Sequence, residues 1–260
     1  MDLNLSGRTA LITGGSKGIG LAVARALAAE SCHLHLVARN PADLEQAAST
    51  IRASHRVDVR VHATDLSQGT ATEALAKACA TIDILVNNAG AIPGGALDAV
   101  DDATWRRSWD LKVFGYINLT RAIYASMRAR RRGVIVNVIG VAGQTPVASY
   151  ISGSAANAAL MMFTRALGGV SLDDGVRVVG VNPGPVATDR MVTLMRTRAA
   201  SELGDPERWA ELLSRLPGGR PATPEEVADL VTFLASDRAG YITGTVVAID
   251  GGLSARGRLV

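Results

Sequence analysis

Short apolar runs alternate with longer helical stretches along most of the chain. The apolar runs have the length and character of strands that are covered on both faces. They lie near residues 8–13, 33–38, 58–63, 82–87, 133–139, 176–182 and 245–250. The stretches between them predict helices near 19–30, 41–54, 68–79, 102–130, 153–170, 190–199, 206–215 and 224–235. This alternation predicts an α/β fold with a parallel sheet and helices on both of its faces.

Length and composition favour one globular domain. The chain has 260 residues, 48% of them hydrophobic, which is enough for a full core. It shows no low-complexity tract, internal repeat or Pro/Ser-rich linker, so we expect a single domain over residues 1–260. No apolar run reaches the roughly 20 residues of a membrane span. The first residues lack a signal-peptide pattern, and we expect a cytoplasmic protein.

Charge and cysteine content give no signal for nucleic-acid or metal binding. The formal net charge is +3. The densest basic run, Arg130-Arg131-Arg132, lies between a predicted helix and a predicted strand, where a solvated helix end is expected. Nucleic acid is therefore not an expected partner. Cys32 and Cys79 show neither a Cys-x-x-Cys spacing nor a histidine cluster, so we expect packed, reduced thiols and no metal site.

A glycine-rich turn follows the first predicted strand and precedes a helix. Its sequence is Thr13-Gly14-Gly15-Ser16-Lys17-Gly18-Ile19-Gly20. Glycines let backbone amides approach a pyrophosphate, and the helix N-terminus adds partial positive charge. The spacing Gly-x-x-x-Gly-x-Gly differs from the commoner Gly-x-Gly-x-x-Gly, and a plain tight turn is the alternative. The turn predicts a dinucleotide site with contacts from Gly14, Ser16, Lys17, Gly18, Ile19 and Gly20.

The end of the second predicted strand favours NADP(H) over NAD(H). Dinucleotide folds read the adenosine ribose here: an acidic residue bonds its 2′-hydroxyl, whereas an arginine accommodates a 2′-phosphate. This chain carries Ala38-Arg39 and no carboxylate at that point. Lys17, inside the glycine turn, can add a second positive charge.

Later strand ends add candidate cofactor contacts. Asp65-Leu66 follows the third strand, where the carboxylate could accept a hydrogen bond from adenine. Small residues in Asn87-Asn88-Ala89-Gly90 let the backbone lie against a cofactor. Prolines stiffen Asn182–Thr188, whose amides and threonine hydroxyl could fix a nicotinamide carboxamide. The predicted contacts are Asp65, Leu66, Asn88, Ala89, Gly90, Pro183, Gly184, Val186 and Thr188.

With these blocks in order, the chain resembles the short-chain dehydrogenase/reductase (SDR) family. The matching blocks are Thr13–Gly20, Asp65, Asn87–Gly90, Pro183-Gly184 with Thr188, and Asp250-Gly251-Gly252. The resemblance implies a single Rossmann-like, doubly wound domain with a seven-stranded parallel sheet, and it implies NAD(P) binding. It also implies a homodimer or homotetramer and a substrate lid at about residues 189–217. The apolar character of this lid predicts a partly apolar substrate.

The four catalytic positions of that family are changed in this chain. The family uses an Asn, a Ser, a Tyr that exchanges a proton with the substrate oxygen, and a Lys that supports this Tyr. The resemblance places these positions at Lys112, Gly140, Gly153 and Asn157. The Asn and Lys types have thus exchanged places, and Tyr150 precedes Gly153 by three residues. We therefore expect an atypical member with Lys112, Asn157 and Tyr150 as candidate catalytic residues.

Three functions are compatible with this pattern. The first is an NADP(H)-dependent oxidoreductase that acts on a carbonyl or hydroxyl group of a partly apolar small molecule. Positioning alone lowers much of the barrier, and general acid–base help adds roughly 10²–10⁴-fold. The alternative is a catalytically silent dinucleotide-binding sensor or subunit partner. The third is non-redox chemistry with Lys112 as base or electrophile, unless this lysine extends to solvent.

Overall fold

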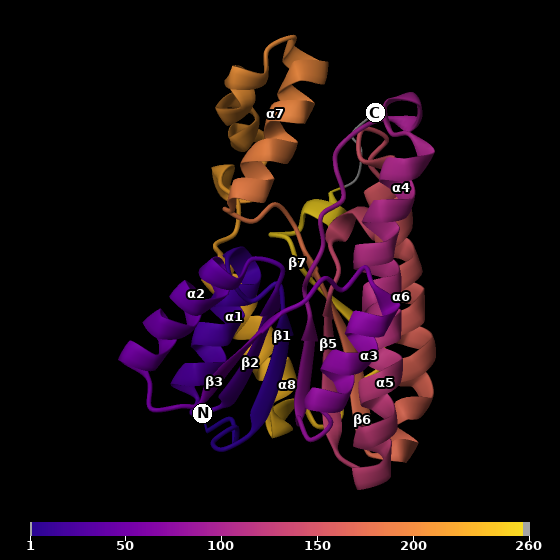
Figure 1. Cartoon of the computed structure of the whole chain (residues 1–260). Helices are drawn as coiled ribbons and strands as arrows, with labels where there is room; N and C mark the ends of the chain where they lie inside the picture. The colour runs from indigo at the N-terminus through magenta and orange to yellow at the C-terminus, as the bar shows by residue number, and fades with distance from the viewer. Residues whose placement is uncertain (1, 257–260) are drawn as a thin grey trace.

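A seven-stranded, fully parallel sheet organises the computed structural model, which describes residues 2–256 (Figure 1). The strand order is β3-β2-β1-β4-β5-β6-β7. The strands are β1 (Thr9–Thr13), β2 (His33–Ala38), β3 (Val59–Ala63), β4 (Ile84–Asn87), β5 (Gly133–Val138), β6 (Val176–Pro183) and β7 (Val246–Ile249). Each lies within two residues of its predicted range. The expected Rossmann-like, doubly wound α/β architecture is confirmed.

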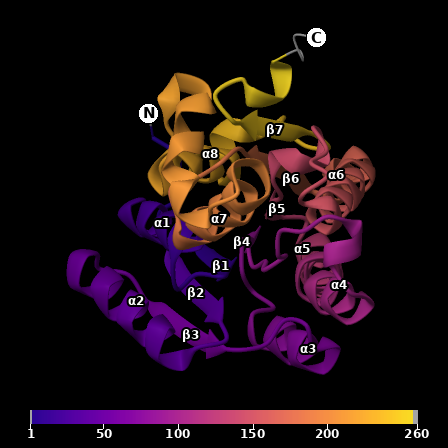
Figure 2. The same cartoon turned by 90° about the horizontal axis from the view of Figure 1, so that it is seen from above.

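Helices cover both faces of this sheet (Figure 2). One face carries α1 (Gly18–Ala29), α2 (Pro41–Ser54) and α8 (Pro224–Ala235); the other carries α3 (Gly69–Ala78), α5 (Gly115–Arg130) and α6 (Ile151–Ser171). Successive strand residues point to opposite faces, so Ala10 and Ile12 join one core and Leu11 joins the other. Each fully buried aliphatic side chain contributes about 1.5–3 kcal/mol. Short 3-10 turns lie at Leu97–Ala99, Val141–Gly143, Leu172–Asp174, Pro217–Gly219, Asp237–Ala239 and Leu253–Ala255.

The helix predicted over residues 102–130 is interrupted. It consists of α4 (Asp102–Trp109), a π-helical turn η2 (Asp110–Phe114) and α5. A π turn widens the helix by one residue, and such turns occur frequently at functional sites. The buried residues of this turn are Lys112 and Val113. The interruption thus directs a lysine into the protein, where an unbroken helix was expected.

Residues 189–217 rise above the carboxyl edge of the sheet as α7 (Asp189–Leu203) and the 3-10 helix η5 (Pro206–Arg215) (Figure 1). The two helices pack on each other through an apolar cluster: Met191, Met195, Ala199 and Leu212, with Val192, Leu203, Trp209 and Leu213 at its margin. Most of the apolar residues of this segment therefore hold the segment together. Their apolar character is therefore weak evidence for a partly apolar substrate.

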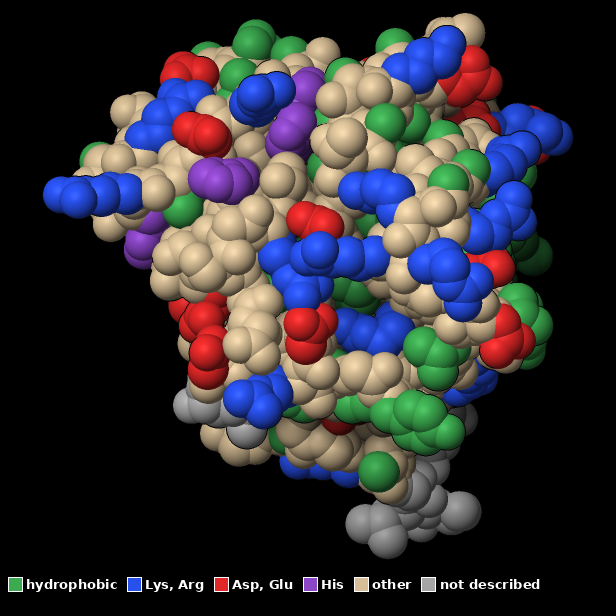
Figure 3. All heavy atoms as spheres, turned by 90° about the horizontal axis from the view of Figure 1, so that it is seen from below, with side chains coloured by type: hydrophobic (Ala, Val, Ile, Leu, Met, Phe, Trp, Pro, Cys, Tyr) green, Lys and Arg blue, Asp and Glu red, His purple; other side chains and the backbone are tan. Residues whose placement is uncertain are grey.

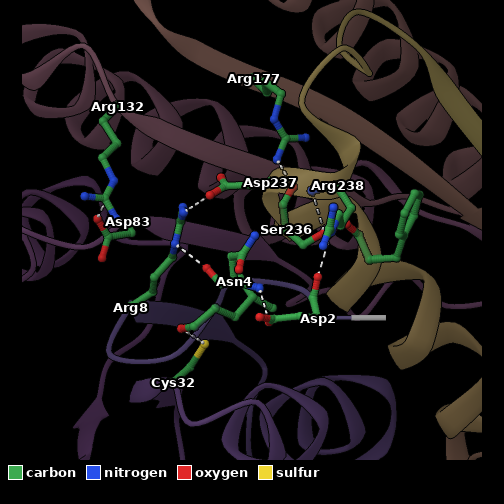
Figure 4. Close-up of polar contacts among 12 residues, drawn as sticks. Asp2, Asn4, Arg8, Cys32, Asp83, Arg132, Arg177, Ser236, Asp237 and Arg238 are labelled. Atoms are coloured by element: carbon green, nitrogen blue, oxygen red, sulfur yellow. Dashed lines mark hydrogen bonds and ion pairs between the residues drawn. The ribbon is translucent and has the colours of Figure 1, made fainter.

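Polar contacts fasten the first residues of the chain to the C-terminal end of α8 (Figure 4). Arg8 pairs with Asp237, and Arg238 donates to the backbone oxygen of Asp2 at 2.7 Å. Buried Arg177 donates to the carbonyl oxygens of Leu234 at 2.8 Å and Ser236 at 2.9 Å. These carbonyls belong to a helix end, where a cation compensates unpaired acceptors. Arg177 therefore has a structural role.

The lower face of the molecule, near these contacts, mixes Lys and Arg side chains with Asp and Glu (Figure 3). Histidine side chains gather on one side of this face. Across residues 2–256, no helix combines the length and the apolarity that crossing a bilayer requires.

Candidate active site

A cleft of about 1080 Å³ opens between the carboxyl ends of the strands and α7. Its position matches the crevice where doubly wound sheets bind ligands, at the point where strand order reverses. Most of the predicted cofactor contacts line it: Gly14, Ser16, Lys17, Gly18, Ile19, Arg39, Leu66, Asn88, Ala89, Gly90, Pro183, Gly184, Val186 and Thr188. The fold therefore brings together loops that the sequence separates by up to 174 residues, from Gly14 to Thr188.

The glycine turn has the geometry of a phosphate cradle. Gly14 and Gly18 have φ angles of +66° and +56°, which favour glycine. A Cβ on Gly20 would lie 2.2 Å from the carbonyl oxygen of Gly14, so Gly20 permits close packing and does not line the cleft. No side chain caps the N-terminus of α1 within the described chain, which leaves its first amides available to an anion. These features fit a dinucleotide pyrophosphate.

The end of β4 holds this turn in place. The Thr13 hydroxyl accepts hydrogen bonds from the backbone amides of Asn88 at 2.8 Å and Ala89 at 3.0 Å. The Asn88 amide group donates back to the Thr13 carbonyl oxygen at 3.0 Å. The two loops therefore form one rigid wall of the cleft.

Positive charge predominates where the adenosine end of a dinucleotide would lie. Lys17 and Arg39 are exposed and line the cleft, and neither has a carboxylate partner among residues 2–256. Arg25 and the carboxylate of Asp43 also line the cleft, and no motif in the sequence marks either residue. Lys17, Arg25 and Arg39 supply the positive charge that an anionic group such as a 2′-phosphate needs, although the lining also holds the carboxylates of Asp43 and Glu225.

Asp65 does not line the cleft. Its Oδ1 accepts hydrogen bonds from the Ser67 amide at 3.0 Å and the Ser67 hydroxyl at 2.8 Å. This side chain thus organises the turn before α3, and its contact with adenine stays a prediction.

Lys112 points into the protein, which excludes the alternative that it extends to solvent. It is 9% exposed and lines the cleft, and its Nζ donates to the Ile139 carbonyl oxygen at 2.6 Å. Gly90 makes room for its stem, since a Cβ there would lie 3.0 Å from the lysine Cδ. Burial, and secondly the positive charge of Arg190, lower the pKa of Lys112 to about 7. A buried amine that can change its charge near neutral pH is suited to proton transfer.

Asn157 and Gly140 lie against each other on the same wall. A Cβ on Gly140 would be 2.9 Å from the Asn157 Nδ2, and Gly140 has a φ of +129° that disfavours other residues. The Asn157 Oδ1 is buried without a hydrogen-bond partner within residues 2–256. A hydrogen bond from Lys112 to Asn157, which exchanged side chains would suggest, is therefore not formed. Asn157 lines the cleft, and its side-chain oxygen is a buried acceptor whose hydrogen-bonding capacity the described residues leave unused.

The ring of Tyr150 covers Gly153. A Cβ on Gly153 would lie only 2.0 Å from two ring carbons of Tyr150, so the phenol occupies the space of a side chain at position 153. Arg190 donates to the Tyr150 hydroxyl oxygen at 3.3 Å and to the Ile92 carbonyl oxygen at 2.5 Å. Both Tyr150 and Arg190 line the cleft. Sequence reasoning identified Tyr150 but gave no signal for Arg190.

A second tyrosine near the site is engaged elsewhere. The Tyr116 hydroxyl donates to the Val138 carbonyl oxygen at 2.9 Å, and its side chain is buried. Burial raises the pKa of Tyr116 well above the usual value. Among the two, Tyr150 is therefore the phenol available to a ligand.

The chain belongs to the short-chain dehydrogenase family, whose model matches residues 8–199. It is 38% identical over 250 residues to galactitol 2-dehydrogenase (L-tagatose-forming) of Cereibacter sphaeroides, covering 95% of each chain. An L-sorbose reductase from Gluconobacter frateurii, solved with NADPH and L-sorbose, superposes with a TM-score of 0.90 at 32% identity, covering 99% of this chain and all of that one. An NAD⁺-bound xylitol dehydrogenase shares the fold with a TM-score of 0.91 at 24% identity, covering 96% of this chain.

This family membership defines the class of chemistry. The protein is an SDR-type oxidoreductase, a class whose members act on hydroxyl or carbonyl groups of small molecules.

The buried position of Lys112 predicts a pH-dependent stability. The pKa falls from an ordinary 10.5 to about 7 on folding, so the unfolded state binds more protons between these values. The free energy of unfolding should therefore rise with pH in this window, by up to about 1.4 kcal/mol per unit. Below pH 7 both states are charged and this contribution to the slope disappears.

Urea unfolding of the parent and of Lys112→Met at several pH values between 6 and 10 tests this expectation. The difference between the two proteins isolates Lys112 from other titrating groups. The exposed Lys77→Met is the control and should follow the parent. If the free energy of unfolding of Lys112→Met rose with pH as steeply as that of the parent, Lys112 would not be a neutral, buried amine in the folded protein.

Proposed function

We propose that this protein is an NADP(H)-dependent oxidoreductase that interconverts a carbonyl and a hydroxyl group of a small molecule, with Tyr150 as the proton-transfer group. The observation that carries the proposal is the phenol ring of Tyr150 directly over Gly153. The resemblance to the family assigns a tyrosine to position 153. One helical turn earlier, this chain supplies the same functional group to the same part of the cleft.

Each residue at the site has a separate role in carbonyl reduction. NADPH, when bound, supplies the hydride to a carbonyl carbon. Tyr150 donates its hydroxyl proton to the carbonyl oxygen, and Arg190 provides a charge opposite to the one that develops on the phenol oxygen. Lys112, held by the Ile139 carbonyl, is a buried proton reservoir on the same wall. Asn157 lines the same wall, and a turn of its side-chain amide toward the cleft would offer its unpaired Oδ1 to a hydroxyl group of the cofactor or substrate.

The substrate is expected to combine apolar and hydroxylated parts. The α7 side of the cleft presents both kinds of side chain, with apolar Leu194 beside polar Thr193, Thr197 and Arg198. Ketoses and polyols are the first candidates, because galactitol and L-sorbose are named for two relatives. Turnover of NADPH with a panel of ketoses and small diketones tests the proposed activity.

Arg39 should determine the choice of cofactor. We expect NADPH to bind at least about tenfold tighter than NADH, since charge-assisted contacts to the 2′-phosphate exceed the 1.4 kcal/mol that tenfold requires. Arg39→Asp should reverse this preference. Calorimetric titration of both cofactors measures it, with exposed Arg56→Asp, which makes the same charge change outside the cleft lining, as control. Equal affinities for the two cofactors in the parent would refute the assignment.

A catalytically silent dinucleotide-binding sensor or subunit partner is the alternative function. Gly140 favours it, because this position supplies no hydroxyl group to orient a substrate. The homodimer or homotetramer and the cytoplasmic location stay predictions.

A further inference from the structure

Three potential metal ligands meet at the edge of the sheet, away from the cleft. They are His35 on β2, His62 on β3 and Cys79 at the C-terminal cap of α3. The register pairs Val37 with His62, so His35 and His62 lie on the same face of neighbouring strands, two positions apart. That face is the one that α3 covers, and α3 ends on it with the thiol of Cys79. Three separate elements therefore converge on one point.

The ligand atoms are close together and mostly buried. The His35 Nδ1 lies 2.9 Å from the His62 Nε2 and 3.1 Å from the Cys79 Sγ, and the remaining Sγ–Nε2 distance is 3.9 Å. Cys79 is 1% exposed and His35 8% exposed, while His62 is half-buried and connects the group to solvent. None of the three lines the cleft as the described residues form it. The proposed oxidoreductase site therefore leaves this group without a role.

We propose that His35, His62 and Cys79 bind a Zn²⁺ ion that fastens β2 and the edge strand β3 to α3. Imidazole nitrogen and thiolate sulfur are the ligands that zinc prefers, in tetrahedral geometry. Three protein ligands leave the fourth position to a water molecule, which the half-exposed side of His62 admits. The ion is structural, because the cofactor cleft lies elsewhere.

The observed distances require only small movements to accept the ion. Bond lengths of about 2.0–2.1 Å to nitrogen and 2.3 Å to sulfur separate two tetrahedral ligands by about 3.3 Å (N–N) or 3.6 Å (N–S). The pairs His35–His62 and His35–Cys79 must therefore open by a few tenths of an ångström, and the third must close by a similar amount. The imidazole planes differ by 10° and must turn so that both lone pairs meet the ion. Rotation of the three side chains would have to supply these changes.

The surrounding charges set the protonation states that the ion meets. Burial, followed by His62 and Arg60, lowers the pKa of His35 to about 4, and burial followed by Arg60 lowers that of His62. Both imidazoles are then neutral at neutral pH and available as ligands. Burial raises the pKa of Cys79 to about 11, which opposes ionisation, so zinc binding must displace this proton to solvent as the zinc–sulfur bond forms. Arg60 opposes a cation, but it is exposed and its charge is screened by solvent.

Zinc titration of the metal-free protein against a chromogenic chelator tests this site. The parent should bind one Zn²⁺ per chain with submicromolar affinity, and Zn²⁺ should raise its thermal midpoint. Cys79→Ser and His62→Gln should each weaken binding by at least about 100-fold, the upper range already seen for outer-sphere changes. NADPH affinity, measured on the same samples, should stay unchanged.

The chain offers matched controls. Cys32 is an equally buried thiol that donates a hydrogen bond to the Leu5 carbonyl oxygen, and His33 lies on the same strand as His35. Cys32→Ser and His33→Gln should bind Zn²⁺ like the parent. A parent that takes up no Zn²⁺ overturns the proposal, and so does a Cys79→Ser protein that binds it equally well. Because the parent's own titration is decisive, a variant that fails to fold leaves the test intact.

Discussion

Tyr150→Phe should lower the rate of carbonyl reduction by about 10²–10⁴-fold, the usual contribution of a positioned general acid. The substitution removes one oxygen atom and keeps the ring that covers Gly153. The pocket shape and the cofactor loops therefore stay as they are. Single-turnover measurement of NADPH oxidation gives the rate, and titration should show NADPH affinity within about threefold of the parent, a difference below 1 kcal/mol.

Tyr124→Phe is the matched control for this substitution. The Tyr124 hydroxyl donates to Asp174 Oδ2 at 2.6 Å, and the residue lies on α5 outside the cleft lining. The substitution removes a hydrogen-bonded phenol hydroxyl that has no access to the substrate, so the reduction rate should not change. A Tyr150→Phe protein that retains the parental rate would assign proton transfer to another group, with Lys112 the next candidate.

Gly153→Ala should inactivate the protein by displacing Tyr150. The new Cβ would lie 2.0 Å from the Tyr150 ring, so the ring must move away and lose its hydrogen bond from Arg190. Overpacking of this kind costs about 1–3 kcal/mol, and the phenol no longer reaches the substrate oxygen. We expect both a lower free energy of unfolding and a rate that approaches that of Tyr150→Phe. Urea unfolding and single-turnover kinetics measure the two effects.

Gly169→Ala on the same helix separates this contact from general helix propensity. A Cβ at Gly169 meets nothing within 4 Å, so alanine there should stabilise by about 0.5–1 kcal/mol. In a Tyr150→Ala background, Gly153→Ala should become stabilising as well, which gives a large coupling energy between the two positions. Additive effects in this double-mutant cycle would mean that the ring does not rest on Gly153.

The pattern along the chain was sufficient to place the sheet and the cofactor loops. Buried parallel strands read as short apolar runs, and glycines that need positive φ angles stand out in sequence, as Gly14 and Gly18 do. The helix predicted over 224–235 is α8, and its first residue agrees because Thr223 and Glu226 form a capping box around Pro224. These features depend on interactions between residues that are close in sequence, so the sequence alone predicts them.

Features that depend on the orientation of a side chain, or on contacts between residues far apart in sequence, were not predictable. A π turn shifts the helical register by one residue. In the 29-residue stretch 102–130, so small a shift leaves no recognisable break in the pattern of apolar and polar residues. No local pattern shows that Tyr150 folds back over Gly153, or that Asp65 turns to Ser67. His35, His62 and Cys79 come together only through strand register and the length of α3. Their spacing of 27 and 17 residues resembles no metal-binding motif.

The most direct test of the central claim is single-turnover oxidation of bound NADPH by the parent protein in the presence of ketoses and small diketones. The account predicts that NADPH is consumed and that one equivalent of the corresponding alcohol appears, with a rate that depends on Tyr150. Tight NADPH binding without any consumption across the panel would contradict the proposed oxidoreductase. That result would instead identify the protein as a silent dinucleotide-binding member of its family.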